Sequence, residues 1–95
     1  MNGIERITAE RKRQIYVEGF WAGHDDEQDM GEIASAAACY ACPPIWQQWW
    51  PWGPDAWKPT DLTKEQTGEP RIRELEKAGA LIAAEIDRLI RLEDK

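Results

Sequence analysis

The fold is decided by residues 69–92, which read EPRIRELEKAGALIAAEIDRLIRL. Apolar or small residues recur in this stretch at intervals of three and four, the spacing that places side chains on one face of an α-helix. These residues are Ile72, Leu75, Gly79, Ile82, Ile86 and Leu89. Pro70 suits a helix start, because the N–H that proline lacks has no partner in the first turn. The stretch therefore predicts a long C-terminal helix.

The apolar arc of this helix is wider than a single stripe. It also includes Ala78, Ala80, Leu81, Ala83, Ala84 and Ile90. A helix that is apolar over so much of its surface is largely surrounded by protein. Two interpretations remain open: the arc packs in the core of its own monomer, or it self-associates. We expect a homo-oligomer held by Ile82, Ile86, Leu89 or Ile90.

A tryptophan-rich segment precedes the long helix. Residues 45–59 read IWQQWWPWGPDAWKP and contain five of the six tryptophans of the chain. Proline and glycine interrupt both helical and strand periodicity, so no regular element is expected there. The sequence predicts a loop over residues 43–68 that packs across the long helix. Such rings pack on the domain, on a partner or on a flat ligand, and we expect most of the following to belong to the core: Trp46, Trp49, Trp50, Trp52 and Trp57.

Two shorter helices are predicted nearer the N-terminus. The first covers residues 4–18 and stops at Gly19, a typical residue after a helix end. The second covers residues 31–42, is rich in alanine, and ends at Pro43 and Pro44. A turn-rich connector, residues 19–31, joins them. The chain is thus predicted to be one all-α domain, residues 1–95, of three helices.

The charge balance limits the classes of partner. The 95 residues carry a net charge of −6, whereas polymeric nucleic acid is bound by a basic face. Positive charge is local, near Arg6, Arg11 and Arg13, and suits one small anion. The sequence shows no signal peptide and no apolar stretch of about 20 residues. We therefore expect a cytoplasmic protein without membrane or nucleic-acid partners.

The two cysteines do not predict a metal centre. Cys39 and Cys42 have the spacing of zinc ligands, but zinc needs about four ligands and His24 is the only histidine. Redox pairs of this spacing lie at helix N-termini, where the thiol pKa is lowered, whereas this pair lies at a predicted C-terminus. Structural cysteines are the simplest interpretation, and neither metal nor cofactor is expected.

No catalytic arrangement is apparent. Helical nucleotide pyrophosphatases hold magnesium with carboxylates one helical turn apart, and Glu74, Glu85 and Asp87 do not form such a buried pair. The chain has no glycine-rich phosphate loop, and no serine or threonine in a nucleophile context with the histidine. The sequence therefore predicts a protein that is not an enzyme.

Residues 24–27, His-Asp-Asp-Glu, have two interpretations. They cap a helix or form salt bridges with Arg11 or Arg13, or some of them contribute to a binding site. The Arg11-Lys12-Arg13-Gln14 run is either a solvated helix face or the polar wall of a pocket. Arginine in such a wall suits bidentate contact with carboxylate or phosphate.

The whole chain resembles a group of small proteins common in tailed phages and prophages. The residues that carry this resemblance are Glu10-Arg11, Arg13-Gln14, Glu18-Gly19, His24 to Glu27, Gly31-Glu32, Ala36 to Tyr40, Trp50 to Trp52, Trp57 to Pro59 and Lys77 to Ile82. The resemblance implies a viral or prophage origin and supplies no activity.

The first half is similar to the ryanodine-receptor repeat, a helical module with a charged helix, Gly-Trp, a glycine and an Asp-Asp pair. The matching residues here are Gly19-Phe20-Trp21, Gly23 and Asp25-Asp26. Phe20 directly follows Gly19, the His-Pro that follows the acids in the module is absent, and the tryptophan-rich segment is additional. The module is associated with adenine-nucleotide binding.

The resemblance implies a ligand site in which Trp21 or Phe20 stacks on a base and Arg13 or Arg11 meets phosphate. The expected binding residues are Arg11, Arg13, Gln14, Phe20, Trp21, His24, Asp25 and Asp26. We therefore expect a phage accessory protein that binds a nucleotide-like ligand, with sequestration of a host immune signal as its role. The alternatives are binding of a host protein through an aromatic surface, and a purely structural oligomer.

Overall fold

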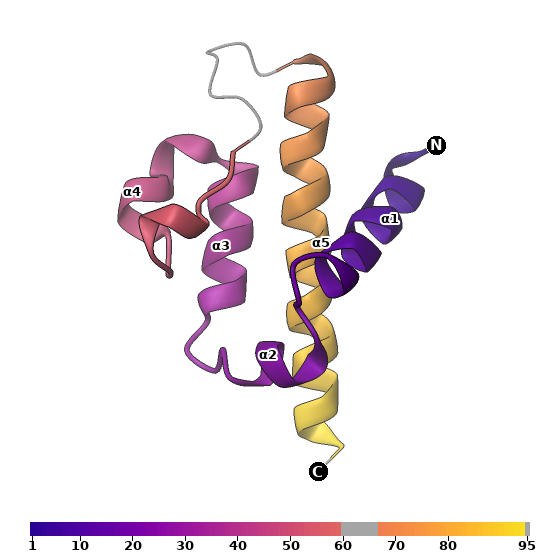
Figure 1. Cartoon of the computed structure of the whole chain (residues 1–95), viewed down its shortest axis with the longest axis vertical. Helices are drawn as coiled ribbons and strands as arrows, with labels where there is room; N and C mark the ends of the chain where they lie inside the picture. The colour runs from indigo at the N-terminus through magenta and orange to yellow at the C-terminus, as the bar shows by residue number, and fades with distance from the viewer. Residues whose placement is uncertain (60–66, 95) are drawn as a thin grey trace.

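The computed structural model describes residues 1–59 and 67–94, and every regular element in those ranges is helical (Figure 1). The predicted all-α class with a long C-terminal helix is confirmed. The helices are α1 (Gly3–Tyr16), α2 (Ala22–Asp26), α3 (Glu32–Ala41), α4 (Trp46–Trp49) and α5 (Gly68–Glu93), with short 3₁₀ turns η1 (Pro43–Ile45) and η2 (Pro54–Ala56). Residues 60–66 of the predicted loop 43–68 lie outside the described residues.

The three longer helices match the predicted ones, and local chemistry explains their ends. At the start of α1, the Asn2 side chain accepts from the Glu5 N–H at 2.9 Å, while the Glu5 carboxylate accepts from the Asn2 N–H at 3.0 Å. This capping box satisfies two N–H groups that a helix start leaves unpaired. Gly19, with φ of 77°, turns the chain after α1 in a conformation that glycine adopts without strain.

Two short helices lie in segments predicted to be irregular. The connector contains α2, and the tryptophan-rich segment contains α4. The expectation of no regular element in residues 45–59 is therefore wrong for Trp46–Trp49. No proline lies between Pro44 and Pro51, which leaves room for one helical turn.

The core lies between α3 and α5, which run side by side (Figure 1). Small side chains on both helices let the two backbones approach closely, and Arg71 on α5 donates to the carbonyls of Tyr40 and Ala41 at 3.3 and 2.6 Å. These bonds satisfy carbonyl groups at the α3 C-terminus that have no helical partner. The buried core consists of Ile33, Ala36, Ala37, Tyr40, Ala78, Leu81 and Ala84.

α1 crosses α5 at Gly79. A Cβ atom at position 79 would lie 2.6 Å from Cδ1 of Ile7, so glycine permits the close approach of the two helices. Arg6 of α1 also pairs with Glu76 of α5 at 3.0 Å. α1 and α3 therefore cover different parts of the α5 surface.

The tryptophan-rich segment packs around Tyr40 of α3. The Tyr40 ring centroid lies 4.8 Å from that of Trp57 and 5.7 Å from that of Trp50. Its ring contacts are thus centred on α3 rather than on the long helix, and Figure 1 shows α4 on the side of α3 away from α5. None of the five rings is fully buried, and Trp49 is 57% exposed. Trp50, Trp52 and Trp57 are half-buried and pack against the core cluster, so three of the five border the core as expected but do not lie inside it.

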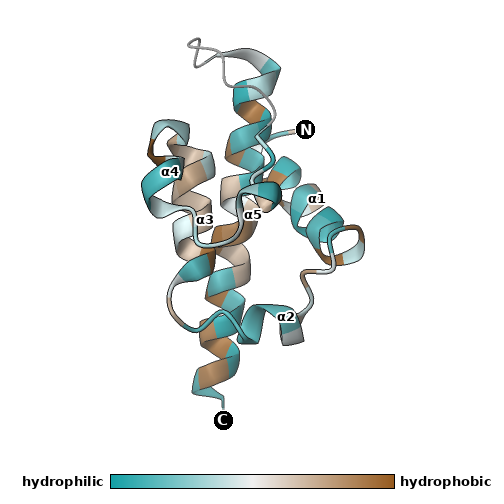
Figure 2. Cartoon of the chain, turned by 60° about the vertical axis from the view of Figure 1, so that its left-hand side comes forward, coloured by the Kyte–Doolittle hydropathy of each residue, from teal (hydrophilic) through white to brown (hydrophobic). Residues whose placement is uncertain are grey.

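Figure 2 shows that hydrophobic colour continues along α5 toward its C-terminal end. Apolar side chains on this helix nevertheless alternate with charged ones. None of the described helices is long and apolar enough to cross a membrane.

Candidate functional site

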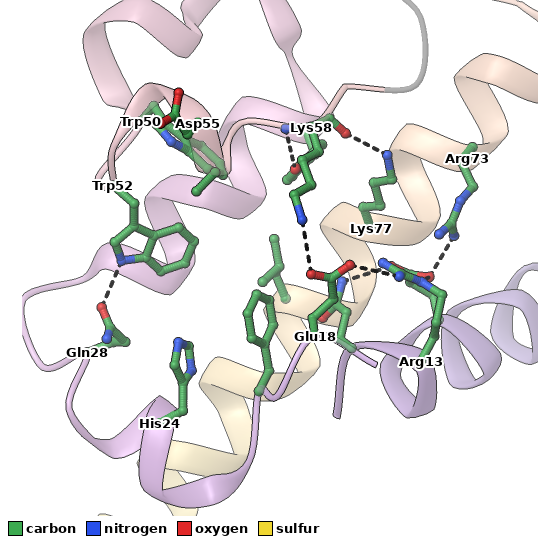
Figure 3. A pocket seen from close by; sticks show the side chains of 16 residues that line it. Arg13, Glu18, His24, Gln28, Trp50, Trp52, Asp55, Lys58, Arg73 and Lys77 are labelled. Atoms are coloured by element: carbon green, nitrogen blue, oxygen red, sulfur yellow. Dashed lines mark hydrogen bonds and ion pairs between the residues drawn. The ribbon is translucent and has the colours of Figure 1, made fainter. Parts of the chain in front are cut away.

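A cavity of about 670 Å³ lies between α1, α2, α3, α5 and the tryptophan-rich segment. Figure 3 shows its two ends: aromatic rings gather on one side, and charged side chains on the other. The lining residues are Glu10, Arg13, Gln14, Glu18, Phe20, His24, Gln28, Tyr40, Trp50, Trp52, Asp55, Ala56, Lys58, Arg73, Lys77 and Leu81.

The aromatic end is built by the connector and the tryptophan-rich segment. The Phe20 and His24 rings are stacked, with centroids 4.8 Å apart and planes 6° from parallel. Trp52 donates its Nε1–H to Oε1 of Gln28 at 2.9 Å, which orients the indole, and the Trp50 ring lies edge-on to it at 5.3 Å. These flat, largely apolar surfaces suit a planar ring system.

The charged end is organised around Glu10, which is only 2% exposed. Its carboxylate pairs with Nε of Arg13 and with Nη1 of Arg73, both at 2.7 Å. Burial disfavours the charged carboxylate, but hydrogen bonds from the two guanidinium groups outweigh it and lower the pKa of Glu10. Glu10 is therefore a buried anion that holds two arginines at the cavity.

Glu18 extends this network toward the tryptophan-rich segment. It accepts from Nη1 of Arg13 at 3.0 Å and from Nζ of Lys58 at 3.3 Å. Lys77 donates to the Lys58 carbonyl at 2.8 Å, and burial lowers the pKa of Lys77. Four cationic and three acidic side chains line the cavity, a local positive excess in a chain whose net charge is −6.

Gln14 supplies an unused acceptor at the cavity. Its side chain is buried, and its Nε2 donates to Oε2 of Glu10 at 3.1 Å. Because a carboxylate can only accept here, the amide nitrogen must face Glu10 and the oxygen must face away. That oxygen, Oε1, has no hydrogen-bond partner among the described residues, and a buried acceptor in this state favours a donor from a ligand or water.

Four of the eight expected binding residues line this cavity: Arg13, Gln14, Phe20 and His24. They come from the end of α1 and from the connector that follows it. The Gly19 turn brings them together, because it reverses the chain and places Phe20 and His24 opposite the last turn of α1. The Phe20 N–H donates to the Gln14 carbonyl at 2.9 Å and stabilises this reversal.

The other four lie outside the cavity lining. Arg11 pairs with the buried Asp25 at 3.5 Å and with Asp87 at 3.6 Å, so its guanidinium serves the junction of α1, α2 and α5. Asp26 pairs with Arg91 at 2.8 Å. Trp21 is 58% exposed and meets the Tyr16 ring edge-on at 6.4 Å. Of the two interpretations of the acidic run, salt bridging describes both aspartates.

Several cavity residues were not among those expected from the sequence. Most of the tryptophans were expected to belong to the core, with packing on a flat ligand as one alternative, and Trp50 and Trp52 line the cavity. No sequence pattern indicated Arg73 or Lys77, because they lie on a different face of α5 from the apolar stripe. Arg73 meets Glu10 of α1, and Lys77 meets the Lys58 carbonyl, only in the folded chain. Likewise, no sequence pattern predicted a binding role for Glu10, Glu18 or Lys58.

Among residues 1–59 and 67–94, no metal-binding group accompanies the cavity, and the side chains of its lining that can react as nucleophiles include Lys77, whose pKa burial lowers. The lining there contains no serine, threonine or cysteine, and no group of three or more His, Cys, Asp or Glu is placed to hold a metal. Cys39 is buried and Cys42 exposed, both as free thiols, and burial raises the pKa of Cys39. The described cavity thus combines an aromatic part with a cationic part.

No protein-family model, curated protein or solved structure matches this chain.

Proposed function

We propose that the protein binds a small nucleotide-like ligand in this cavity and does not turn it over. The observation that supports the proposal most is that stacked aromatic rings and paired arginines face the same cavity. A nucleotide combines a planar base with anionic phosphate, and the two ends differ in the same way. Binding cavities for small ligands range over about 300–1,000 Å³, and the volume of about 670 Å³ falls within that range.

The base is proposed to lie at the aromatic end, between Phe20 and Trp52. Aromatic side chains contribute about 1–3 kcal/mol per stacked base in single-stranded nucleic-acid complexes. Gln14 Oε1 would accept from an exocyclic amine or a ribose hydroxyl. Leaving such an acceptor empty in the complex costs about 1–3 kcal/mol, so ligands with a donor in this place are favoured.

The phosphate is proposed to lie at the charged end, beside Arg13 and Lys58. Glu10 and Glu18 already accept from Arg13, which moderates the attraction for an anion. Lys58 is exposed, and its ammonium carries three donors, of which Glu18 engages one. We therefore expect modest affinity for one phosphate, weakened by salt.

The biological role follows from the resemblance to phage proteins and to the ryanodine-receptor repeat. We propose an accessory protein that holds a host nucleotide signal, with adenine as the favoured base.

Calorimetry with AMP, ATP, cyclic adenine dinucleotides and ADP-ribose tests this proposal, with adenosine and inorganic phosphate as fragments. We expect at least one nucleotide to bind more tightly than either fragment. The Trp52→Ala and Arg13→Gln variants should lose about tenfold or more in affinity, about 1.4 kcal/mol. The matched control is Trp49→Ala, which removes an exposed ring outside the cavity lining.

The Trp21→Ala variant distinguishes binding in the cavity from binding at the site that the resemblance to the ryanodine-receptor repeat implies. If the cavity binds the ligand, Trp21→Ala leaves affinity unchanged. A loss with Trp21→Ala but not with Trp52→Ala would move the site to the connector surface. If none of the nucleotides binds at millimolar concentration, the proposal fails.

A further inference from the structure

One side of α5 carries an exposed aliphatic stripe. This stripe, called the α5 stripe, consists of six large side chains that are each 37–52% exposed: Ile72, Leu75, Ile82, Ile86, Leu89 and Ile90. With Gly79, the positions from 72 to 89 alternate steps of three and four without interruption. No charged residue occupies a position of this repeat.

α1, α2 and α3 all contact α5, and the six exposed members of the stripe lie between the sides that α3 and α1 cover. α3 contacts the side that carries Ala78, Leu81 and Ala84, and α1 contacts the side that carries Glu76 and Asp87. At about 100° per residue, the stripe occupies the remaining third of the helix circumference. Ile7 of α1 borders it at Gly79.

A strict three-four repeat is the pattern of a helix that pairs with another helix along its length. Alternating steps average 3.5 residues per turn, which keeps the same side chains facing a partner helix over several turns. A compact partner surface or a membrane would not require this alternation. The occupant best matched to the stripe is a helix with the same repeat.

We propose that the α5 stripe pairs with the α5 stripe of a second copy of this chain, with the two helices antiparallel. In one register the members of the two stripes pair throughout. Ile72 then faces Leu89 of the second copy, and Leu75 faces Ile86 of the second copy. Ile82 of the second copy meets the Gly79 position together with the Ile7 side chain that packs over it. The two-fold axis passes between the Gly79 and Ile82 positions, so the interface is closed and self-complementary.

The antiparallel direction is favoured by charge. A parallel, in-register pair would place Glu93 opposite itself, which repels. In the antiparallel register Glu93 instead faces Gly68 of the second copy, so this repulsion is absent.

The buried area is adequate for a specific dimer of modest size. The pair covers the exposed halves of six aliphatic side chains from each copy, on the order of 1,000 Å² in total, near the lower limit for specific interfaces. Like many interface cores, the stripe is aliphatic and uncharged. We therefore expect dissociation in the micromolar range.

The dimer is independent of the proposed ligand site. The cavity uses Arg73, Lys77 and Leu81 of α5, and no member of the α5 stripe lines it. Pairing therefore leaves the cavity open in both copies. The failure of either proposal leaves the other standing.

Sedimentation equilibrium tests the association. The chain has a mass of 10.9 kDa, and we expect about twice that mass at high micromolar concentration. Ile82→Glu and Ile86→Glu place charges at the centre of the interface and should weaken association at least a hundredfold. Ile4→Glu is the matched control, because Ile4 is exposed on α1 outside the stripe, and it should remain dimeric. A wild-type chain that stays monomeric at high micromolar concentration overturns the proposal.

Disulfide trapping tests the direction, in a Cys42→Ser background that removes the exposed thiol. Leu75→Cys and Ile86→Cys chains are prepared separately, oxidised alone and then mixed. Antiparallel pairing predicts a disulfide only in the mixture, because each position lies about 16 Å along the helix from its own copy. Self-linked Leu75→Cys dimers would establish parallel pairing, and the absence of any cross-link would show that the stripes do not meet. Both results contradict the proposed interface.

Discussion

The carboxylate of Glu10 on α1 lies 2.7 Å from the guanidinium of Arg73 on α5, so a buried carboxylate and a partly exposed arginine join the first and last helices at the cavity. Arg13 completes the cluster from one turn further along α1, also at 2.7 Å. A buried charge is tolerated when paired, and removal of one partner leaves the others uncompensated. Glu10 thus has a structural function and also positions the cations of the candidate site.

We expect Glu10→Gln to lower the free energy of unfolding by about 2 kcal/mol. Breaking a buried pair costs about 3–5 kcal/mol, but Arg13 retains Glu18 and Arg73 retains Glu76, which reduces the loss. Urea denaturation measures the change, with the exposed Glu93→Gln as control. A loss below about 0.5 kcal/mol would show that Glu10 does not hold the helices together.

Acid should weaken the protein through the same cluster. The pKa values of Glu10 and Glu18 are lowered from the ordinary value of 4.5, with hydrogen bonds from arginine favouring both charged forms. A lowered folded-state pKa contributes stability above the ordinary value, and this contribution is lost as the pH falls through the folded pKa. We expect stability to decline below about pH 4.5, and the decline to be shallower in Glu10→Gln. Equal slopes in both proteins would contradict this.

Gly79→Ala should destabilise the protein by about 1 kcal/mol. Alanine gains about 1 kcal/mol over glycine in helix propensity, but its Cβ would meet Ile7 Cδ1 at 2.6 Å and Cγ1 at 2.8 Å. Such crowding costs about 1–3 kcal/mol. In an Ile7→Ala background the crowding is absent, so the same Gly79→Ala change should stabilise. Thermal melts of the four proteins in this cycle measure the coupling, and additive effects would show that the two side chains do not clash.

Trp57→Ala and Trp49→Ala should differ clearly in stability. Trp57 stacks on Trp46 at 5.5 Å and packs on Tyr40 at 4.8 Å. Its truncation should cost about 2–3 kcal/mol, less than for a fully buried ring because Trp57 is partly exposed. Trp49 is exposed, and its truncation should change stability by less than about 0.5 kcal/mol. Similar losses for both variants would mean that the Trp57 ring contacts contribute little.

Local sequence patterns were sufficient to predict the three longer helices. The three-four repeat from Ile72 to Leu89 predicted α5, and the alanine run before Pro43 predicted α3. Both patterns act within a few residues, through propensity, periodicity and the missing N–H of proline, so they can be read without a fold. The short α2 and α4 escaped because single helical turns have no repeat to detect.

The candidate site was only partly visible in the same way. Arg13, Gln14, Phe20 and His24 lie close together in the sequence, and the Gly19 turn makes them neighbours in space. Arg11 and Arg13 could not be distinguished from composition, since they lie two residues apart on α1. Helical geometry directs Arg11 toward Asp25 and Asp87, and Arg13 toward the cavity.

The sequence by itself determined the three longer helices, their approximate ends, and that an aliphatic stripe runs along the last helix. Only the tertiary structure decided that Arg73 and Lys77 share a cavity with Trp52, and that α1 and α3 leave the α5 stripe uncovered. The physical reason is the range of the interactions. Capping and periodicity act between near neighbours in the chain, whereas helix crossing at Gly79 and the burial of Glu10 depend on how distant segments pack.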